Sequence, residues 1–289
     1  MQTTTLLTVA GLVLVATSLV VVGDTAGKLL TQDGVSPVFV AWARFALGAL
    51  IILPLSGLNS GEIRNFLNPK VVMRAVFIAG GICSILTALR SEPIANVFGA
   101  FFIGPMVSYI LAVVFLKEPI TKLRTILLLI GFLGVMLVVK PGFGATPGIG
   151  FALLAGCFYG AYLTMTRAIS GDLRPRFLLL SQLVVGAILL APIGATSPWP
   201  EPSRTAYLLI LTSAMASAMG NYLLVRASRM ASATIIAPFI YNQLFAATIL
   251  GVLVFNELPD AVSLLGLVLI ALSGFGTLLA VRRQDIERV

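Results

Sequence analysis

Arg44 is the charged residue whose position most needs a chemical explanation, because it lies inside an apolar run from residue 37 to residue 55. If that run crosses a membrane, a charge there costs about 2.5–3.5 kcal/mol on insertion scales and should face a cavity or a partner. A guanidinium group can hold a carboxylate or a phosphate through two parallel hydrogen bonds. Arg44 is therefore a candidate for binding an anionic group. A structural ion pair or the capping of backbone carbonyls is the alternative, and both stay open.

Asp24 is the expected partner of Arg44. Asp24 lies near the end of one apolar run and Arg44 near the start of the next, so consecutive helices would bring both into the same half of a membrane. Asp24 also precedes Lys28 by four residues, the favourable order for an ion pair on one helix. We therefore expect Asp24 to lie between two cations.

A second group of candidates consists of hydrogen-bonding side chains within apolar runs. Tyr241, Asn242 and Gln243 are consecutive, so they point in three directions and cannot all face lipid cheaply. We expect them to line a cavity, and hydrogen bonds between helices are the alternative. Weaker candidates of the same type are Tyr109, Tyr159, Tyr162, Asn221 and Tyr222. Trp42 is expected either to stack on a planar molecule or to fill the core.

The composition determines which elements must position these residues. Of the 289 residues, 58% are hydrophobic and only 10% are charged, and the mean hydropathy is +1.04. Soluble domains carry about a quarter charged residues, so lipid must act as the solvent here. The chain has no histidine, which excludes His-dependent triads, zinc-protease helices and haem ligation by His. Cys83 and Cys157 lie in apolar runs and indicate no metal pair. We expect no cofactor and no catalytic site.

Apolar runs between proline, glycine and charged breaks predict an all-α membrane protein with ten transmembrane helices. Several prolines fall at or just before predicted starts, where proline is tolerated. The predicted spans are 5–27, 37–55, 71–89, 95–116, 121–139, 147–168, 176–194, 206–225, 233–255 and 261–281.

The distribution of Lys and Arg gives an independent test of that prediction. With ten helices, most Lys and Arg residues, Arg74 among them, fall on the side of the even-numbered loops and the C-terminus. Cytoplasmic loops collect positive charge, so both termini are predicted to be cytoplasmic in a multi-pass protein of the cytoplasmic membrane. No basic cluster is long enough to follow a phosphate backbone, so nucleic acid is not an expected partner.

The two halves of the sequence resemble each other. Without a gap, Pro37, Phe39, Gly48, Ala49 and Pro54 align with Pro175, Phe177, Gly186, Ala187 and Pro192. In this alignment the neutral Gln182, a further candidate for the binding site, takes the place of Arg44, so one half of the site is expected to be more positive than the other. Five helices per half is an odd number, so residues 1–140 and 141–289 are predicted to form two inverted five-helix repeats with a binding site between them.

These features resemble the drug/metabolite transporter superfamily, and in particular its EamA-type ten-helix members. The resemblance covers essentially the whole chain. It rests on the segment Asp24–Lys28, on Arg44 and Pro54, on Glu118-Pro119, on Tyr241 with Gln243, and on Glu257.

The resemblance implies a secondary transporter that moves a small organic metabolite across the cytoplasmic membrane, with membrane lipid as the other partner. Amino acids, vitamins such as riboflavin, and similar planar or anionic solutes are the candidate substrates. Asp24, Glu118 and Glu257 are candidates for coupling transport to an ion, although carboxylates at helix ends also occur without such a role. The alternatives are a membrane-embedded enzyme or lipid-handling protein, and a channel or assembly partner; a homo-oligomer stays open.

Overall fold

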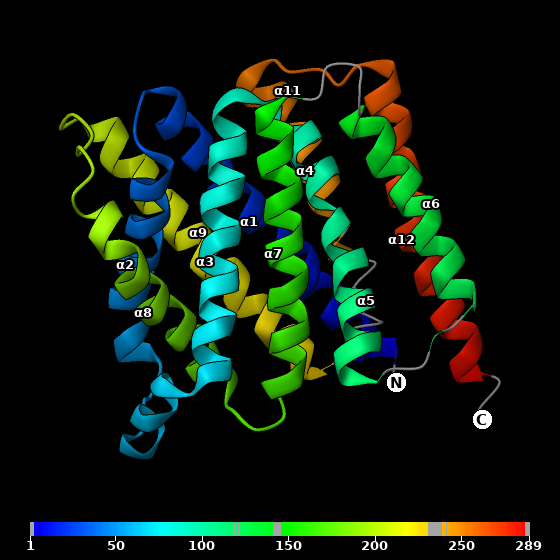
Figure 1. The fold of residues 1–289 in the computed structure, drawn as a ribbon, viewed down its shortest axis with the longest axis horizontal. Coiled ribbons are helices and arrows are strands. Elements are labelled where there is room, and N and C mark those ends of the chain that lie inside the picture. Colours follow the sequence, from blue (N-terminus) through cyan, green and yellow to red (C-terminus); the bar gives the residue numbers. More distant parts are fainter. Residues whose placement is uncertain are drawn as a thin grey trace.

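The computed structural model is a bundle of α-helices (Figure 1). It describes residues 3–286 apart from 118–119, 121, 141–145, 231–238 and 241. The elements in this part of the chain are α1 (Thr3–Gln32), α2 (Pro37–Leu55), the 3-10 helix η1 (Ser60–Leu67), α3 (Pro69–Ser91), α4 (Ile94–Phe101), α5 (Ile103–Leu116), α6 (Lys122–Val139), α7 (Pro147–Ile169), α8 (Pro175–Gly194), α9 (Arg204–Met230), α11 (Asn242–Phe255) and α12 (Ala261–Ile286).

Seven helical segments among the described residues are long and apolar enough to cross a membrane, and three shorter apolar helices accompany them. Large apolar side chains such as Leu50, Phe115, Ile188 and Leu253 are exposed on the outside of the bundle, as expected for a protein surrounded by lipid. The predicted all-α membrane class is confirmed. Every predicted span overlaps a described helix, although residues 231–238 of the ninth span lie outside the described residues.

Four helices begin at a proline, which explains why the sequence located their starts well. Pro37, Pro69, Pro147 and Pro175 occupy the first turn, where the missing N–H would have had no partner within the helix. The side chain of Asn68 caps α3 by accepting a hydrogen bond from the backbone N–H of Lys70.

The predicted continuous helix over 95–116 is instead interrupted at Phe102, between α4 and α5. Pro105 has no N–H to donate to the carbonyl of Phe101, so the helical hydrogen bonds stop there. A Cβ atom added at Gly156 of α7 would lie only 2.5 Å from that carbonyl oxygen. The break therefore lies where two backbones cross closely, and α4 and α5 together still form one apolar segment from Ile94 to Leu116.

Small residues permit two further close crossings. A Cβ atom at Gly160 of α7 would lie 2.5 Å from the carbonyl oxygen of Gly104 in α5. One at Gly220 of α9 would lie 2.6 Å from the carbonyl oxygen of Ala16 in α1. These approaches bring α7 against α5 and α9 against α1, so the polar side chains of the bundle interior face each other.

Candidate functional site

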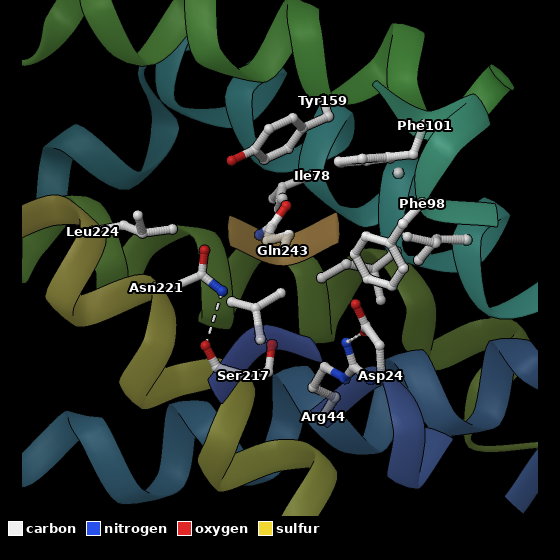
Figure 2. Close-up of a pocket in the computed structure, with 14 residues that line it drawn as sticks. Asp24, Arg44, Ile78, Phe98, Phe101, Tyr159, Ser217, Asn221, Leu224 and Gln243 are labelled. Carbon is white, nitrogen blue, oxygen red and sulfur yellow. Dashed lines mark hydrogen bonds and ion pairs between the residues drawn. The ribbon is translucent and has the colours of Figure 1, made fainter. Parts of the chain in front are cut away.

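A cavity of about 50 Å³ lies in the centre of the bundle, among α1, α2, α3, α4, α7, α9 and α11 (Figure 2). Its wall combines aromatic rings, from Phe98, Phe101 and Tyr159, with polar groups. Sites for drug-sized ligands typically measure about 300–1,000 Å³. The cavity therefore has to widen before an organic molecule can occupy it.

The first polar cluster, formed by Asp24, Arg44 and Ser213, lies at one side of this cavity. Arg44 Nη1 lies 2.7 Å from Asp24 Oδ1, and both residues are almost completely buried. Arg44 Nε and Nη2 donate to Ser213 Oγ at 3.2 and 2.9 Å, and Nη2 also donates to the carbonyl oxygen of Gly23 at 3.0 Å. The predicted pairing of Asp24 with Arg44 is confirmed. The charge of Arg44 is thus balanced within the protein.

Lys28 does not join that pair, which corrects the expectation from its spacing to Asp24. Lys28 Nζ lies 2.6 Å from Glu257 Oε1 and also donates to the carbonyl oxygen of Glu92 at 2.8 Å. Glu257 Oε2 accepts the backbone N–H of Ile94 at 3.0 Å. Four segments thus meet at this end of the bundle, because the end of α1 packs between the start of α4 and the residues after α11.

The second polar cluster is formed by Arg74, Tyr162 and Gln182. Tyr162 and Gln182 were candidates from the sequence, whereas Arg74 was not. Arg74 is fully buried in α3, although the distribution of Lys and Arg along the sequence places it with the loop charges. Its Nη2 donates to the Tyr162 hydroxyl at 2.8 Å, and that hydroxyl donates to Gln182 Oε1 at 2.8 Å. Arg74 Nε and Nη1 donate to Thr166 Oγ1 at 2.7 Å and to the carbonyl oxygen of Leu178 at 2.8 Å. The available signal was that Arg74 falls inside the predicted helix 71–89.

Among the predicted cavity residues, Tyr159, Asn221 and Gln243 do line the cavity. Asn221 Nδ2 donates to the carbonyl oxygen of Ser217 at 2.8 Å, so the amide oxygen of Asn221 points away from Ser217 (Figure 2). Gln243 is buried, and in the described part of the chain its Oε1 has no hydrogen-bond partner. A buried acceptor without a donor costs free energy, so Gln243 is suited to receive a hydrogen bond from a solute.

Other predicted residues lie elsewhere in the described bundle. Asn242 Nδ2 donates to Thr17 Oγ1 and Ser18 Oγ at 3.1 Å, so it joins α11 to α1, as its alternative interpretation required. The hydroxyl of Tyr109 lies 3.3 Å from Thr125 Oγ1 of α6. Tyr222 packs against the cluster of buried residues around Phe45.

Trp42 belongs to an aromatic cluster. Its ring centroid lies 5.9 Å from that of Phe39 and 6.2 Å from that of Trp199. A Cβ atom added at Gly194 would collide with the Trp42 side chain, so Trp42 packs α2 closely against α8. Glu118 and Tyr241 lie outside the described residues.

The sequence profile of the EamA-like transporter family matches residues 5–140 and again residues 146–279. The chain belongs to the EamA-like transporter family. It is therefore a multi-pass membrane protein that transports small metabolites, and it is not an enzyme.

Relatives of this family member carry several named solutes. It is 26% identical over 236 residues to an S-adenosylmethionine uptake transporter of Rickettsia felis, covering 80% of this chain and 79% of the relative. It is 25% identical over 222 residues to a riboflavin transporter of Brucella anthropi, covering 72% and 76%. It is 24% identical over 238 residues to the pseudopaline exporter CntI of Pseudomonas aeruginosa, covering 81% and 83%.

A solved crystal structure shares the fold of this family member. The TM-score is 0.67 at 16% sequence identity, and the match covers 95% of this chain and 99% of the other. At such low identity the likeness concerns the fold alone.

Proposed function

We propose that this protein is a secondary transporter that carries a planar organic metabolite across the cytoplasmic membrane by alternating access. The observation that carries the proposal is the central cavity, which lies between two polar clusters, one toward each end of the bundle. A carrier needs a site that is reached from each side in turn. A membrane-embedded enzyme or lipid-handling protein is not favoured.

The repeat supports two routes of access. Residues 1–140 and 141–289 form the two inverted five-helix repeats in this proposal, and the family profile matches once in each of them. The offset that aligns Pro37 with Pro175 also aligns Asp24 with Tyr162 and Arg44 with Gln182. Asp24 and Arg44 lie in the first polar cluster, and the residues aligned with them, Tyr162 and Gln182, lie in the second.

The proposed orientation has both termini in the cytoplasm, with ten crossings. The start of α1 and the end of α12 lie at the same end of the bundle (Figure 1), as an even number of crossings requires. The turn between α1 and α2 and the turn between α7 and α8 lie at opposite ends. Since Arg44 follows the first turn and Gln182 the second, the first cluster would face the outside and the second the cytoplasm.

The substrate class follows from the cavity wall and from the relatives. S-adenosylmethionine and riboflavin, the solutes named for two relatives, both contain a planar heteroaromatic ring. Phe98, Phe101 and Tyr159 offer ring faces for stacking, and the Gln243 amide oxygen offers an acceptor. We propose a planar organic solute with hydrogen-bonding edges, bound between these groups. Asp24 and Glu257 are proposed coupling groups, and Glu118 keeps that role as a prediction.

Counterflow in proteoliposomes tests this proposal. Vesicles containing purified protein and unlabelled riboflavin or S-adenosylmethionine should accumulate the labelled solute transiently above equilibrium, because a carrier exchanges one molecule for another. Tyr159→Leu should raise the solute concentration needed for half-maximal exchange by about tenfold, because one stacking contact is lost. The matched control Tyr207→Leu changes an exposed tyrosine of α9 and should leave exchange unchanged. Simple equilibration without overshoot would instead indicate a channel.

A further inference from the structure

Arg74 differs from every other fully buried charge in the described part of the chain. The fully buried charged residues there are Asp24, Lys28, Arg44 and Arg74. Asp24 pairs with Arg44, and Lys28 pairs with Glu257. The ion pairs of the described residues do not include Arg74, whose guanidinium donates hydrogen bonds to two hydroxyls and a backbone carbonyl. Arg74 therefore leaves one unbalanced positive charge inside the bundle.

That charge lies close to the cavity. Ile78, one helical turn after Arg74 on α3, lines the cavity, so the two residues are separated by about 6 Å along the helix axis. The guanidinium lies 4.7 Å from the ring centroid of Tyr162, which in turn stacks on the cavity residue Tyr159 at 5.9 Å. Little water can screen a charge in such surroundings, so its potential extends into the cavity.

We propose that Arg74 determines the charge selectivity of transport: it favours planar solutes with a carboxylate or phosphate over neutral analogues, and it disfavours analogues that carry a cation without such an anionic group. This inference rests on the proposed function for its cavity and its route. On this proposal the residue that attracts anions is Arg74 of the second polar cluster. Arg44 is not that residue, because Asp24 balances its charge. Arg74 acts through space and positions the anionic group, so it needs no direct contact with the solute.

Three probes of the same shape isolate charge from every other property: benzoate, benzamide and benzamidinium. We expect purified full-length protein to be stabilised against heat at the lowest concentration by benzoate and at the highest by benzamidinium. The difference between benzoate and benzamide should be about tenfold, because a full charge acts over a short distance in a poorly screened interior.

Two variants should abolish that order in different ways. Arg74→Gln removes the charge. Gln182→Glu keeps Arg74 but adds a carboxylate to its hydrogen-bonded cluster, which balances the charge of Arg74. This variant therefore still tests the ranking of the probes if Arg74→Gln does not fold. Arg90→Gln, an exposed position at the other end of α3, is the matched control and should preserve the order. A merely structural role for Arg74 would lower stability without changing the ranking of the probes.

The inference fails if the wild-type protein is stabilised by benzoate no more readily than by benzamide, including the case in which neither stabilises it. It also fails if Arg74→Gln or Gln182→Glu keeps the full preference. Counterflow without charge ranking would overturn this inference and leave the proposed function standing. Charge ranking without counterflow would overturn the proposed function alone.

Discussion

Each of the two polar clusters combines residues from both halves of the sequence, yet the two clusters balance charge differently. In the first, Arg44 is held by the carboxylate of Asp24 together with Ser213. In the second, Arg74 is held by neutral oxygens only, as far as the described residues go, and the aligned positions carry Tyr162 and Gln182. The first cluster is neutral overall, whereas the second carries a net positive charge.

If the two proposed repeats pack alike, they still need not present the same charge to a solute, because a few buried residues set the local potential. The comparison also separates two effects of removing an arginine. Deleting Arg44 leaves a buried carboxylate alone, whereas deleting Arg74 leaves only neutral groups.

The largest effect is expected for Arg44→Gln. Breaking one partner of a buried ion pair typically costs about 3–5 kcal/mol, because the remaining charge is desolvated and unpaired. Thermal unfolding in detergent should show this loss, and Asp24→Asn combined with Arg44→Gln should recover part of it. Arg204→Gln, at an exposed arginine of α9, is the control. A melting temperature for Arg44→Gln equal to that of the control would contradict the conclusion that Asp24 and Arg44 form a buried, charge-balanced pair.

A smaller loss is expected for Arg74→Gln. Thr166, Tyr162 and the Leu178 carbonyl lose a donor, which costs about 1–3 kcal/mol, but no charge is left unpaired. The same thermal unfolding experiment compares this variant with Arg44→Gln. If Arg74→Gln is the more damaging of the two, the contrast between the clusters is wrong.

Tyr162→Phe refines the second cluster further. It removes the hydroxyl that joins Arg74 to Gln182 and should cost about 1 kcal/mol. Tyr159→Phe is the matched change on the neighbouring ring and should cost less, since the hydroxyl-mediated link belongs to Tyr162. Equal melting temperatures for the two variants would show that this link contributes little.

The smallest effect is expected at the exposed pair of Glu62 and Arg174, outside the membrane-spanning helices. Hydrogen bonds from Arg174 hold the pKa of Glu62 below its usual range. The pair therefore stabilises the fold above about pH 4.5, and this contribution is lost as the pH falls through the lowered pKa. Glu62→Gln should lower stability by about 1 kcal/mol or less near neutral pH and remove this acid-dependent part. An acid titration of the melting temperature in both proteins measures it.

Much of the helix framework could be predicted from the sequence, because apolar length and proline at helix starts are local properties. The interruption at Phe102 could not, since Pro105 is compatible with a kinked continuous helix until α7 packs against it. The pairing of Asp24 with Arg44 was also predictable, because short connections bring consecutive helices together. The partners of Lys28 were not, because Glu257 is remote in the sequence and nothing local selects it over Asp24.

The sequence by itself determined that this chain is a membrane protein, where its helices begin, and to which family it belongs. Composition, proline positions and the order of motifs suffice for this, because they can be read directly along the chain. Only the tertiary structure decided which buried charges are balanced. Arg74 looks like a loop charge until α3 packs against α7 and α8, and that packing both buries the guanidinium and surrounds it with neutral oxygens. Charge balance in a membrane bundle depends on which helices touch, and that information exists only in three dimensions.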